Sequence, residues 1–242
     1  MKKHRYIDFL AKLAVDNAHP GGHGLTEAIV DRLSMRQKSD ILDVGCGTGA
    51  TAVFLSEKVQ ADVTGIDLHP VMVERAKARA KESRLSPKII QASAEQLPFQ
   101  TNRFDYLISE SVTAFTDVSY SVPEYFRVLR PGGSLAAVEM TIEKPLDEEN
   151  KRAIESVYGV DDVHTETEWL TIWKSAGFIN VEALHANKLL KQSKDILPTY
   201  NLTSQIDEEA LEVWLEHLQT MQVYQNVLTY RVFTMTKPEL NK

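Results

Sequence analysis

Short apolar runs alternate with helix-like stretches between residues 39 and 186 of the chain. The runs predict buried strands at residues 41–44, 62–67, 87–93, 104–109, 134–140 and 179–184. The stretch after the second run has the apolar face of a helix, formed by Met72, Val73, Ala76 and Ala80. Strands that alternate with helices predict crossover connections, a parallel sheet and helices on both faces of that sheet.

The last apolar run, at residues 227–237, is rich in β-branched and aromatic residues and predicts a seventh strand. Because no helical pattern follows it, this strand is expected to run antiparallel beside its predecessor. The Pro-Gly-Gly sequence at 131–133 is expected to end a helix at 121–130, with Gly132 and Gly133 at positive φ. The predicted fold class is therefore α/β, a doubly wound and mostly parallel seven-stranded sheet whose last strand is antiparallel.

Further helical patterns lie before the sheet region and near its end. The first two have apolar faces separated by a glycine-rich break at 18–26, and the faces are formed by Ile7, Leu10, Leu13 and Ala14, and by Leu25, Ala28, Ile29 and Leu33. An acidic helix at 207–224, capped by Asp207, is expected to turn inward the side chains of Leu211, Trp214, Leu215 and Leu218. Its alternative roles are to cover the mouth of the substrate site or to pair with a second subunit in a homodimer. We predict one domain, with an N-terminal helical lid (1–38), a core (39–186), a helical insertion (187–226) and a last strand with its tail (227–242).

Composition and charge narrow the class of partner. The chain has 242 residues and a formal net charge of −7. Its single cysteine excludes an intramolecular disulfide and a cysteine-cage zinc site, so a cytoplasmic setting is expected. No apolar stretch approaches the roughly 18 residues of a membrane span. Basic residues are scattered along the chain, which disfavours nucleic acid as a partner and favours a small molecule. The N-terminal histidines His4, His19 and His23 lack a metal-binding spacing, so no metal site is expected.

The sequence ILDVGCGTGA, residues 41–50, places three glycines at alternate positions directly after the first strand. Glycine lets the backbone turn sharply and lets a ligand approach it closely, although a tight turn alone would favour two of the three. The following helix directs its free N–H groups at the same place. Asp67 ends the second strand, 18 residues after Gly49, where a carboxylate can accept hydrogen bonds from both hydroxyls of a ribose. The alternative role for Asp67 is to cap the next helix.

At this point the chain resembles a class I, Rossmann-like S-adenosylmethionine-dependent methyltransferase of the small-molecule type, the group that includes the ubiquinone and menaquinone C-methyltransferases. The similarity covers roughly residues 39–186, and its motifs occur in order. They are ILDVGCGTG (41–49), VTGIDLHPVMVERAK (63–77), ASAEQLPFQTNRFDYLISES (92–111), RVLRPGGSLAAVE (127–139) and WKSAGFINVE (173–182).

The resemblance implies a cofactor, S-adenosylmethionine, with S-adenosylhomocysteine as product. Asp43 matches the acid that orients the cofactor's amino group, Asp67 the ribose acid and Leu68 the apolar residue packed on adenine. Ala94 would present backbone to the adenine edge, and Ser93 stands where the family usually has aspartate. The full set of implied cofactor contacts is Asp43, Gly45, Cys46, Gly47, Gly49, Asp67, Leu68, Ser93, Ala94, Glu95 and Ser109.

Methyl transfer from a sulfonium is a direct displacement, and a general base is needed only if the acceptor must lose a proton. The candidates are Glu110, which follows the fourth strand, and His23 in the glycine-rich break, with His19 and Glu139 as weaker ones. Cys46 is expected to pack rather than to act as a nucleophile, because no activating partner is evident.

Aromatic residues could wall an apolar pocket for the acceptor, although tryptophans at helical spacing are more often core. The candidates are Phe115, Tyr120, Trp169 and Trp173.

Three functions fit these patterns. The first is an enzyme that transfers a methyl group to a small organic acceptor. The second is a sensor or scaffold that binds the cofactor without turnover, and the third is a nicotinamide-dependent oxidoreductase. The glycine spacing GxGxG, in place of the GxGxxG of dinucleotide binders, counts against the third.

Overall fold

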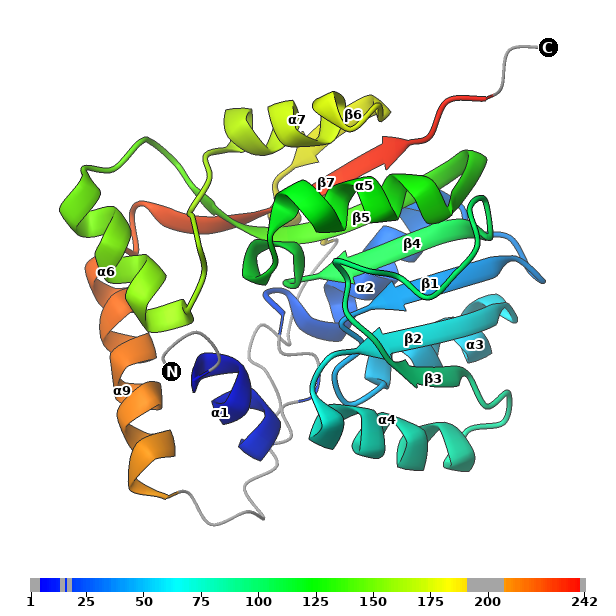
Figure 1. The fold of residues 1–242 in the computed structure, drawn as a ribbon, viewed down its shortest axis with the longest axis horizontal. Coiled ribbons are helices and arrows are strands. Elements are labelled where there is room, and N and C mark those ends of the chain that lie inside the picture. Colours follow the sequence, from blue (N-terminus) through cyan, green and yellow to red (C-terminus); the bar gives the residue numbers. More distant parts are fainter. Residues whose placement is uncertain (1–4, 14–15, 17–18, 191–206, 240–242) are drawn as a thin grey trace.

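A seven-stranded sheet with the strand order β3-β2-β1-β4-β5-β7-β6 forms the centre of the protein (Figure 1). The computed structural model describes residues 5–13, 16, 19–190 and 207–239. The strands are β1 (Asp40–Val44), β2 (Asp62–Asp67), β3 (Lys88–Gln91), β4 (Phe104–Glu110), β5 (Leu129–Ile142), β6 (Ile179–Leu184) and β7 (Leu228–Thr236). Strand β7 runs antiparallel to β5 and β6, whereas β1 to β5 pair in parallel. The predicted mixed sheet with an antiparallel last strand is confirmed.

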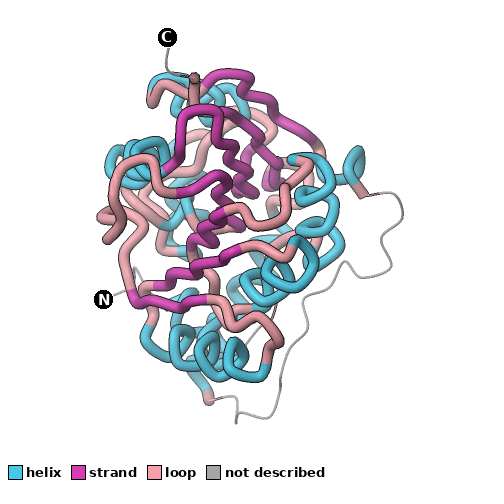
Figure 2. Tube along the Cα trace, turned by 90° about the vertical axis from the view of Figure 1, so that its right-hand side faces the viewer, coloured by secondary structure: helices cyan, strands magenta, loops and turns pink. Residues whose placement is uncertain are grey.

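Helices cover both faces of the sheet, which appears as a twisted central layer in Figure 2. One face packs against α2 (Gly22–Leu33), α3 (Ala50–Val59), α4 (Pro70–Glu82) and the short α8 (Ala186–Leu189). The other face packs against α5 (Val118–Val128) and α7 (Glu166–Ser175). Ile41 and Leu42 of β1 point to opposite faces and are both fully buried. Strands covered on both sides explain why the sequence shows continuous apolar runs there.

Three helices from distant parts of the sequence gather beyond the carboxyl ends of the parallel strands (Figure 1). We call them the cap helices: α1 (Arg5–Leu13), α6 (Glu148–Tyr158) and α9 (Glu208–Val223), each of which contacts the other two. The predicted lid and the predicted insertion thus contribute to one structure. None of the described helices is long and apolar enough to cross a membrane.

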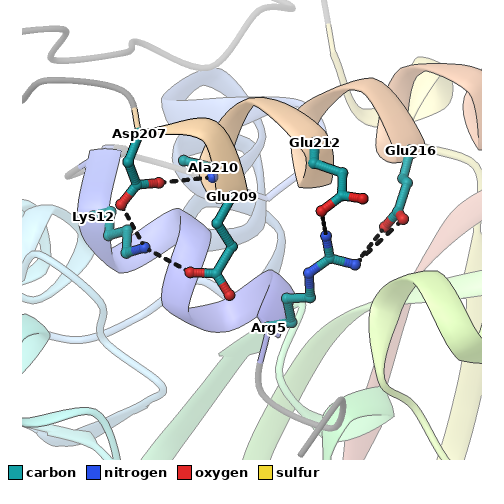
Figure 3. Close-up of polar contacts among 7 residues, drawn as sticks. All are labelled: Arg5, Lys12, Asp207, Glu209, Ala210, Glu212 and Glu216. Carbon is teal, nitrogen blue, oxygen red and sulfur yellow. Dashed lines mark hydrogen bonds and ion pairs between the residues drawn. The ribbon is translucent and has the colours of Figure 1, made fainter.

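Helices α1 and α9 are joined by apolar and ionic contacts (Figure 3). Arg5 pairs with Glu212 at 2.5 Å and with Glu216 at 3.0 Å, and Lys12 pairs with Asp207 at 2.9 Å and with Glu209 at 3.1 Å. Exposed ion pairs contribute about 0–1 kcal/mol each. Most of the stabilisation therefore comes from the apolar contacts between the helices, formed by Phe9, Leu13, Ala210 and Val213.

The structure corrects the inward face predicted for α9. Of the predicted set, Trp214 packs against the contact with α1, but Leu211, Leu215 and Leu218 are exposed. The buried residues of this contact on α9 are Ala210 and Val213. The helix has apolar residues on two faces, so periodicity alone could not tell which face packs. Asp207 does cap α9, as predicted, and accepts a hydrogen bond from the Ala210 N–H at 2.8 Å. Ala14 of the first predicted helix and residues 191–206 of the predicted insertion lie outside the described residues.

The Pro-Gly-Gly sequence does not end a helix, and this prediction was wrong. Helix α5 ends at Val128 and strand β5 already begins at Leu129. Gly132 has φ of 75°, and Gly133 has no positive φ. The Gly132 N–H donates to the Lys237 carbonyl and the Lys237 N–H donates to the Gly133 carbonyl, both at 2.9 Å. The glycines therefore allow β5 to pair with the segment that follows β7.

Candidate functional site

The loop between β1 and α3 holds its three glycines at positive φ: 66° at Gly45, 52° at Gly47 and 81° at Gly49. A Cβ on Gly45 would lie 2.2 Å from Val112 Cγ2, and one on Gly49 would lie 3.0 Å from Ala76 Cα. A Cβ on Gly47 would meet no atom of the described residues within 4 Å. Packing therefore explains the first and third glycines, whereas Gly47 leaves bare backbone beside open space that a ligand can occupy.

Asp67, the last residue of β2, lies directly beside this loop. Its Oδ2 accepts a hydrogen bond from the Gly47 N–H at 2.9 Å, and its Oδ1 accepts one from the His69 N–H at 2.8 Å. Burial raises the pKa of Asp67, and the two N–H donors oppose that rise. His69 occupies the N-cap position of α4 without a capping bond from its own side chain, and Asp67 contacts the start of that helix through the His69 N–H. The next side chain, Leu68, is 59% exposed and offers an apolar surface beside the carboxylate.

Asp43, in the middle of the site, is buried in β1. Its Oδ2 has no hydrogen-bond partner among the described residues. Burial raises the pKa of Asp43 well above its usual value, and the negative charges of Glu110 and Asp67 raise it further. A buried carboxylate oxygen without a partner is costly, so this atom fits a positively charged ligand group.

The segment after β3 folds back against the start of α5. Ser93 Oγ accepts a hydrogen bond from the Glu95 N–H at 3.1 Å, and Glu95 Oε1 accepts one from the Asp117 N–H at 2.8 Å. Ala94 is buried in the core on the same face as α5. Cys46, in the glycine loop, is also buried, and burial raises the pKa of its thiol. Because its thiol stays protonated, Cys46 has the environment of a packing residue.

Glu110, the last residue of β4, is held by side chains from three segments. Thr26 of α2 donates a hydrogen bond to Oε1 at 2.8 Å, and Thr51 of α3 donates one to Oε2 at 2.9 Å. His19, in the turn before α2, places Nε2 3.4 Å from Oε2. The side chain of Glu110 is only 6% exposed, so its carboxylate is fixed where β4 ends.

The two candidate histidines lie in different surroundings. The predicted glycine-rich break is too long, because α2 begins at Gly22 and His23 lies in its first turn. His23 is exposed and its ring packs edge-on against Phe54 at 4.5 Å. No hydrogen bond or ion pair joins His23 to Glu110 within the described ranges, whereas His19 is buried and contacts Glu110. Of the two histidines, His19 is therefore the one that the structure places beside Glu110. His4 lies outside the described residues.

The side chains of Ser109 and Glu139 contact the turn that follows β4, which is the 3₁₀ helix η1 (Thr113–Phe115). Ser109 Oγ lies 3.0 Å from Thr113 Oγ1, so this predicted cofactor contact bonds to the turn. The two carboxylate oxygens of Glu139 accept hydrogen bonds from the N–H groups of Thr113 and Ala114, each at 3.1 Å. Burial raises the pKa of Glu139 to about 7.

Replacing Glu139 by glutamine is expected to change how stability depends on pH. The pKa of Glu139 is about 7 in the folded protein, against a usual value of 4.5. Between these values the folded protein keeps a proton that the unfolded chain has lost, so the wild-type free energy of unfolding falls as pH rises, by up to about 3 kcal/mol. Glutamine has no such proton, so Glu139→Gln should gain about that much relative to wild type between about pH 4 and about pH 8. Urea denaturation of both proteins measures this, and a constant difference would contradict it.

The aromatic candidates divide between core and cap. Trp169 and Trp173 are fully buried with their rings stacked at 5.7 Å, so their interpretation as core residues is confirmed. Tyr120 is exposed. Phe115 stacks on Tyr6 of α1 at 6.1 Å, which places it between the end of β4 and the cap helices.

Two residues that hold this site together, Thr51 and Asp16, are not among the residues predicted from the sequence. Thr51 stands two residues after Gly49 at the start of a predicted helix, so its proximity to the strand ends could have been inferred. Nothing in the local pattern points to Asp16, which accepts a hydrogen bond from the Thr48 hydroxyl and pairs with Arg79 at 2.7 Å. These contacts hold the N-terminal segment against the glycine loop.

The fold is Rossmann-like, and the candidate site lies at the carboxyl edge of its sheet, where ligands bind in folds of this class. A family described as "Methyltransferase domain" matches residues 41–133. An uncharacterized methyltransferase, YodH, from Bacillus subtilis (strain 168) is 34% identical over 235 residues, which cover 96% of this chain and 99% of that relative. The demethylmenaquinone methyltransferase of Listeria welshimeri is 32% identical over 111 residues, 44% of this chain and 47% of its own length.

Among solved structures, phosphoethanolamine N-methyltransferase 2 of Haemonchus contortus in complex with S-adenosyl-L-methionine has a TM-score of 0.77 at 20% identity. That comparison covers 97% of this chain and 57% of the other, so this chain spans little more than half of that protein. The chain belongs to the class I S-adenosylmethionine-dependent methyltransferases, and S-adenosylmethionine is its cofactor.

Proposed function

We propose that the enzyme transfers the methyl group to a small organic acceptor bound between the carboxyl edge of the sheet and the cap helices. The observation that carries the proposal is the meeting of the Gly47 loop, Asp67 and Glu110 at that edge, where Gly47 and Asp67 are hydrogen-bonded at 2.9 Å. The unpartnered Oδ2 of Asp43 fits the cofactor's ammonium group, and Asp67 fits its ribose hydroxyls. The open space at Gly47 fits the methionine portion.

The cofactor supplies an electrophilic methyl group on a sulfonium when it is bound. The protein's part is to hold the acceptor in line with that group, which can account for about 7–11 kcal/mol of the barrier. Glu110 is the proposed base for an acceptor that must lose a proton, and His23, which is exposed, is the alternative. The cap helices would exclude water from the reacting groups.

Aromatic side chains between the end of β4 and the cap helices favour an apolar or aromatic acceptor. Tyr6 stacks on Phe115 at 6.1 Å with an angle of 6° between the rings, and its ring lies 5.0 Å from Tyr158 and 5.6 Å from His217. Of the two acceptors named in the comparisons above, demethylmenaquinone offers an aromatic ring and phosphoethanolamine does not. The cluster therefore supports a quinol-like or phenolic acceptor for this chain.

The test is an acceptor panel in the presence of S-adenosylmethionine, with phenols, quinols, aromatic amines and phosphoethanolamine, read out as S-adenosylhomocysteine formed. Turnover with a phenolic or quinol acceptor is expected. Turnover with phosphoethanolamine alone would contradict the acceptor class. Binding of S-adenosylhomocysteine without turnover of any acceptor would favour the sensor or scaffold alternative.

A further inference from the structure

The ring of His19 faces hydrogen-bond acceptors on both sides. Its Nδ1 lies 3.3 Å from the carbonyl oxygen of Pro20, which can only accept. Its Nε2 lies 3.3 Å from Thr26 Oγ1 and 3.4 Å from Glu110 Oε2. The Thr26 hydroxyl donates its hydrogen to Glu110 Oε1. The Thr26 oxygen can therefore only accept a hydrogen bond from His19. Both ring nitrogens therefore need a hydrogen, which describes an imidazolium.

Glu110, in turn, is surrounded by donors. Thr26 and Thr51 each donate a hydrogen bond to its carboxylate, and the His19 Nε2 lies 3.4 Å from Oε2, which is the setting that an ionised carboxylate requires. The charged pair is almost fully shielded, with side chains 5% exposed at His19 and 6% at Glu110. A buried carboxylate without a cation would be strongly destabilised, so His19 is what allows Glu110 to remain ionised here.

The two oxygens of Glu110 are not equally occupied. Oε2 accepts a hydrogen bond from Thr51 and also lies 3.4 Å from the His19 Nε2, whereas Oε1 has only Thr26 beside it among the described residues. A carboxylate oxygen can accept about two hydrogen bonds, so Oε1 keeps room for one more donor. The contacts from His19 and Thr51 thus fix which oxygen faces a new partner.

We propose that His19 is a positioning residue for methyl transfer, which keeps Glu110 ionised and leaves Oε1 as the atom that accepts the acceptor's proton. This inference rests on the proposed function. The proton lost by the acceptor's O–H or N–H as it is methylated goes to Glu110 Oε1, and Glu110 releases it to solvent after the product leaves. The N-terminal segment, although far from Glu110 in sequence, is thereby part of the reaction site.

The first experiment needs no acceptor. Protein labelled with ¹⁵N-histidine is examined by NMR at about pH 7, and His19 is assigned by the signals that vanish in His19→Gln. Two protonated ring nitrogens are expected for His19 in the wild type, and one in Glu110→Gln. A neutral ring in the wild type, or a ring unchanged by Glu110→Gln, would overturn the proposal.

The second experiment separates positioning from a merely structural role. Using the acceptor that the panel identifies, His19→Gln and Glu110→Gln should each lower kcat at least tenfold, and the double variant should be no slower than Glu110→Gln because the residues act as one unit. The Kd for S-adenosylhomocysteine should stay within about threefold of wild type. His185→Gln is the control, because His185 is exposed at the start of α8 and makes no side-chain capping bond.

Independent, additive losses in kcat, or a loss in S-adenosylhomocysteine affinity that accounts for the whole effect, would overturn the positioning role. If the wild type turns over no acceptor, the proposed function fails. The NMR result still decides whether the ionised pair exists, so the two failures are distinguishable.

Discussion

Replacing Asp67 by alanine is expected to raise the Kd for S-adenosylhomocysteine more than tenfold and to leave the fold intact. The carboxylate is the proposed partner of the ribose hydroxyls, and hydrogen bonds to a charged group contribute about 1.5–3 kcal/mol each. It also holds the Gly47 N–H at 2.9 Å, so its loss frees the loop beside the cofactor. Calorimetric titration measures the affinity, and circular dichroism with a thermal scan reports on the fold.

Asp62→Ala is the matched control for this experiment. Asp62 begins the same strand and is exposed at its opposite end, so its removal should leave affinity unchanged. Wild-type affinity in Asp67→Ala would remove the ribose assignment. Equal losses in both variants would point to a general effect on β2 instead.

Alanine at Gly45 and alanine at Gly47 are expected to fail in different ways. Both positions have positive φ, 66° and 52°, so both variants carry left-handed strain of about 1–2 kcal/mol. At Gly45 the new Cβ would also lie 2.2 Å from Val112 Cγ2, which adds overpacking of about 1–3 kcal/mol. At Gly47 it meets no atom within 4 Å in the part of the chain that the structure describes, so the added loss there is in cofactor affinity, by more than tenfold.

Urea denaturation and titration with S-adenosylhomocysteine on both variants separate these effects. Gly45→Ala should be the less stable protein. In Gly47→Ala the free energy of unfolding should fall only by the left-handed strain of about 1–2 kcal/mol. Normal affinity in Gly47→Ala would show that the open space at this glycine is not where the ligand lies.

The central strands could be predicted because their signal is local. The run at 62–67 corresponds to β2 without a shift of either end, and its apolar residues Val63 and Ile66 are buried between the covering layers. Helix α9 shows the limit of the same reasoning. Its leucines at 211, 215 and 218 have helical spacing, but α1 packs against another face, and a sequence pattern cannot show which of two apolar faces finds a partner.

Part of the candidate site could also be predicted. The structure places the glycine loop and Asp67 in direct contact, and among the residues it describes the Oδ2 of Asp43 has no hydrogen-bond partner. Their roles toward the cofactor remain predictions that the variants above test. The choice of histidine could not be made in advance, because His19 and His23 lie four residues apart in the same glycine-rich segment and differ only in what folds against them.

The sequence by itself determined the sheet, its antiparallel last strand, the glycine turn and the cofactor class, because these depend on local apolar periodicity and on motifs of nearby residues. Only the tertiary structure decided that α1, α6 and α9 share one cap and that Glu110 meets His19, Thr26 and Thr51. Those contacts join residues 59 to 91 positions apart, and their formation depends on the packing of whole helices, which no local pattern specifies.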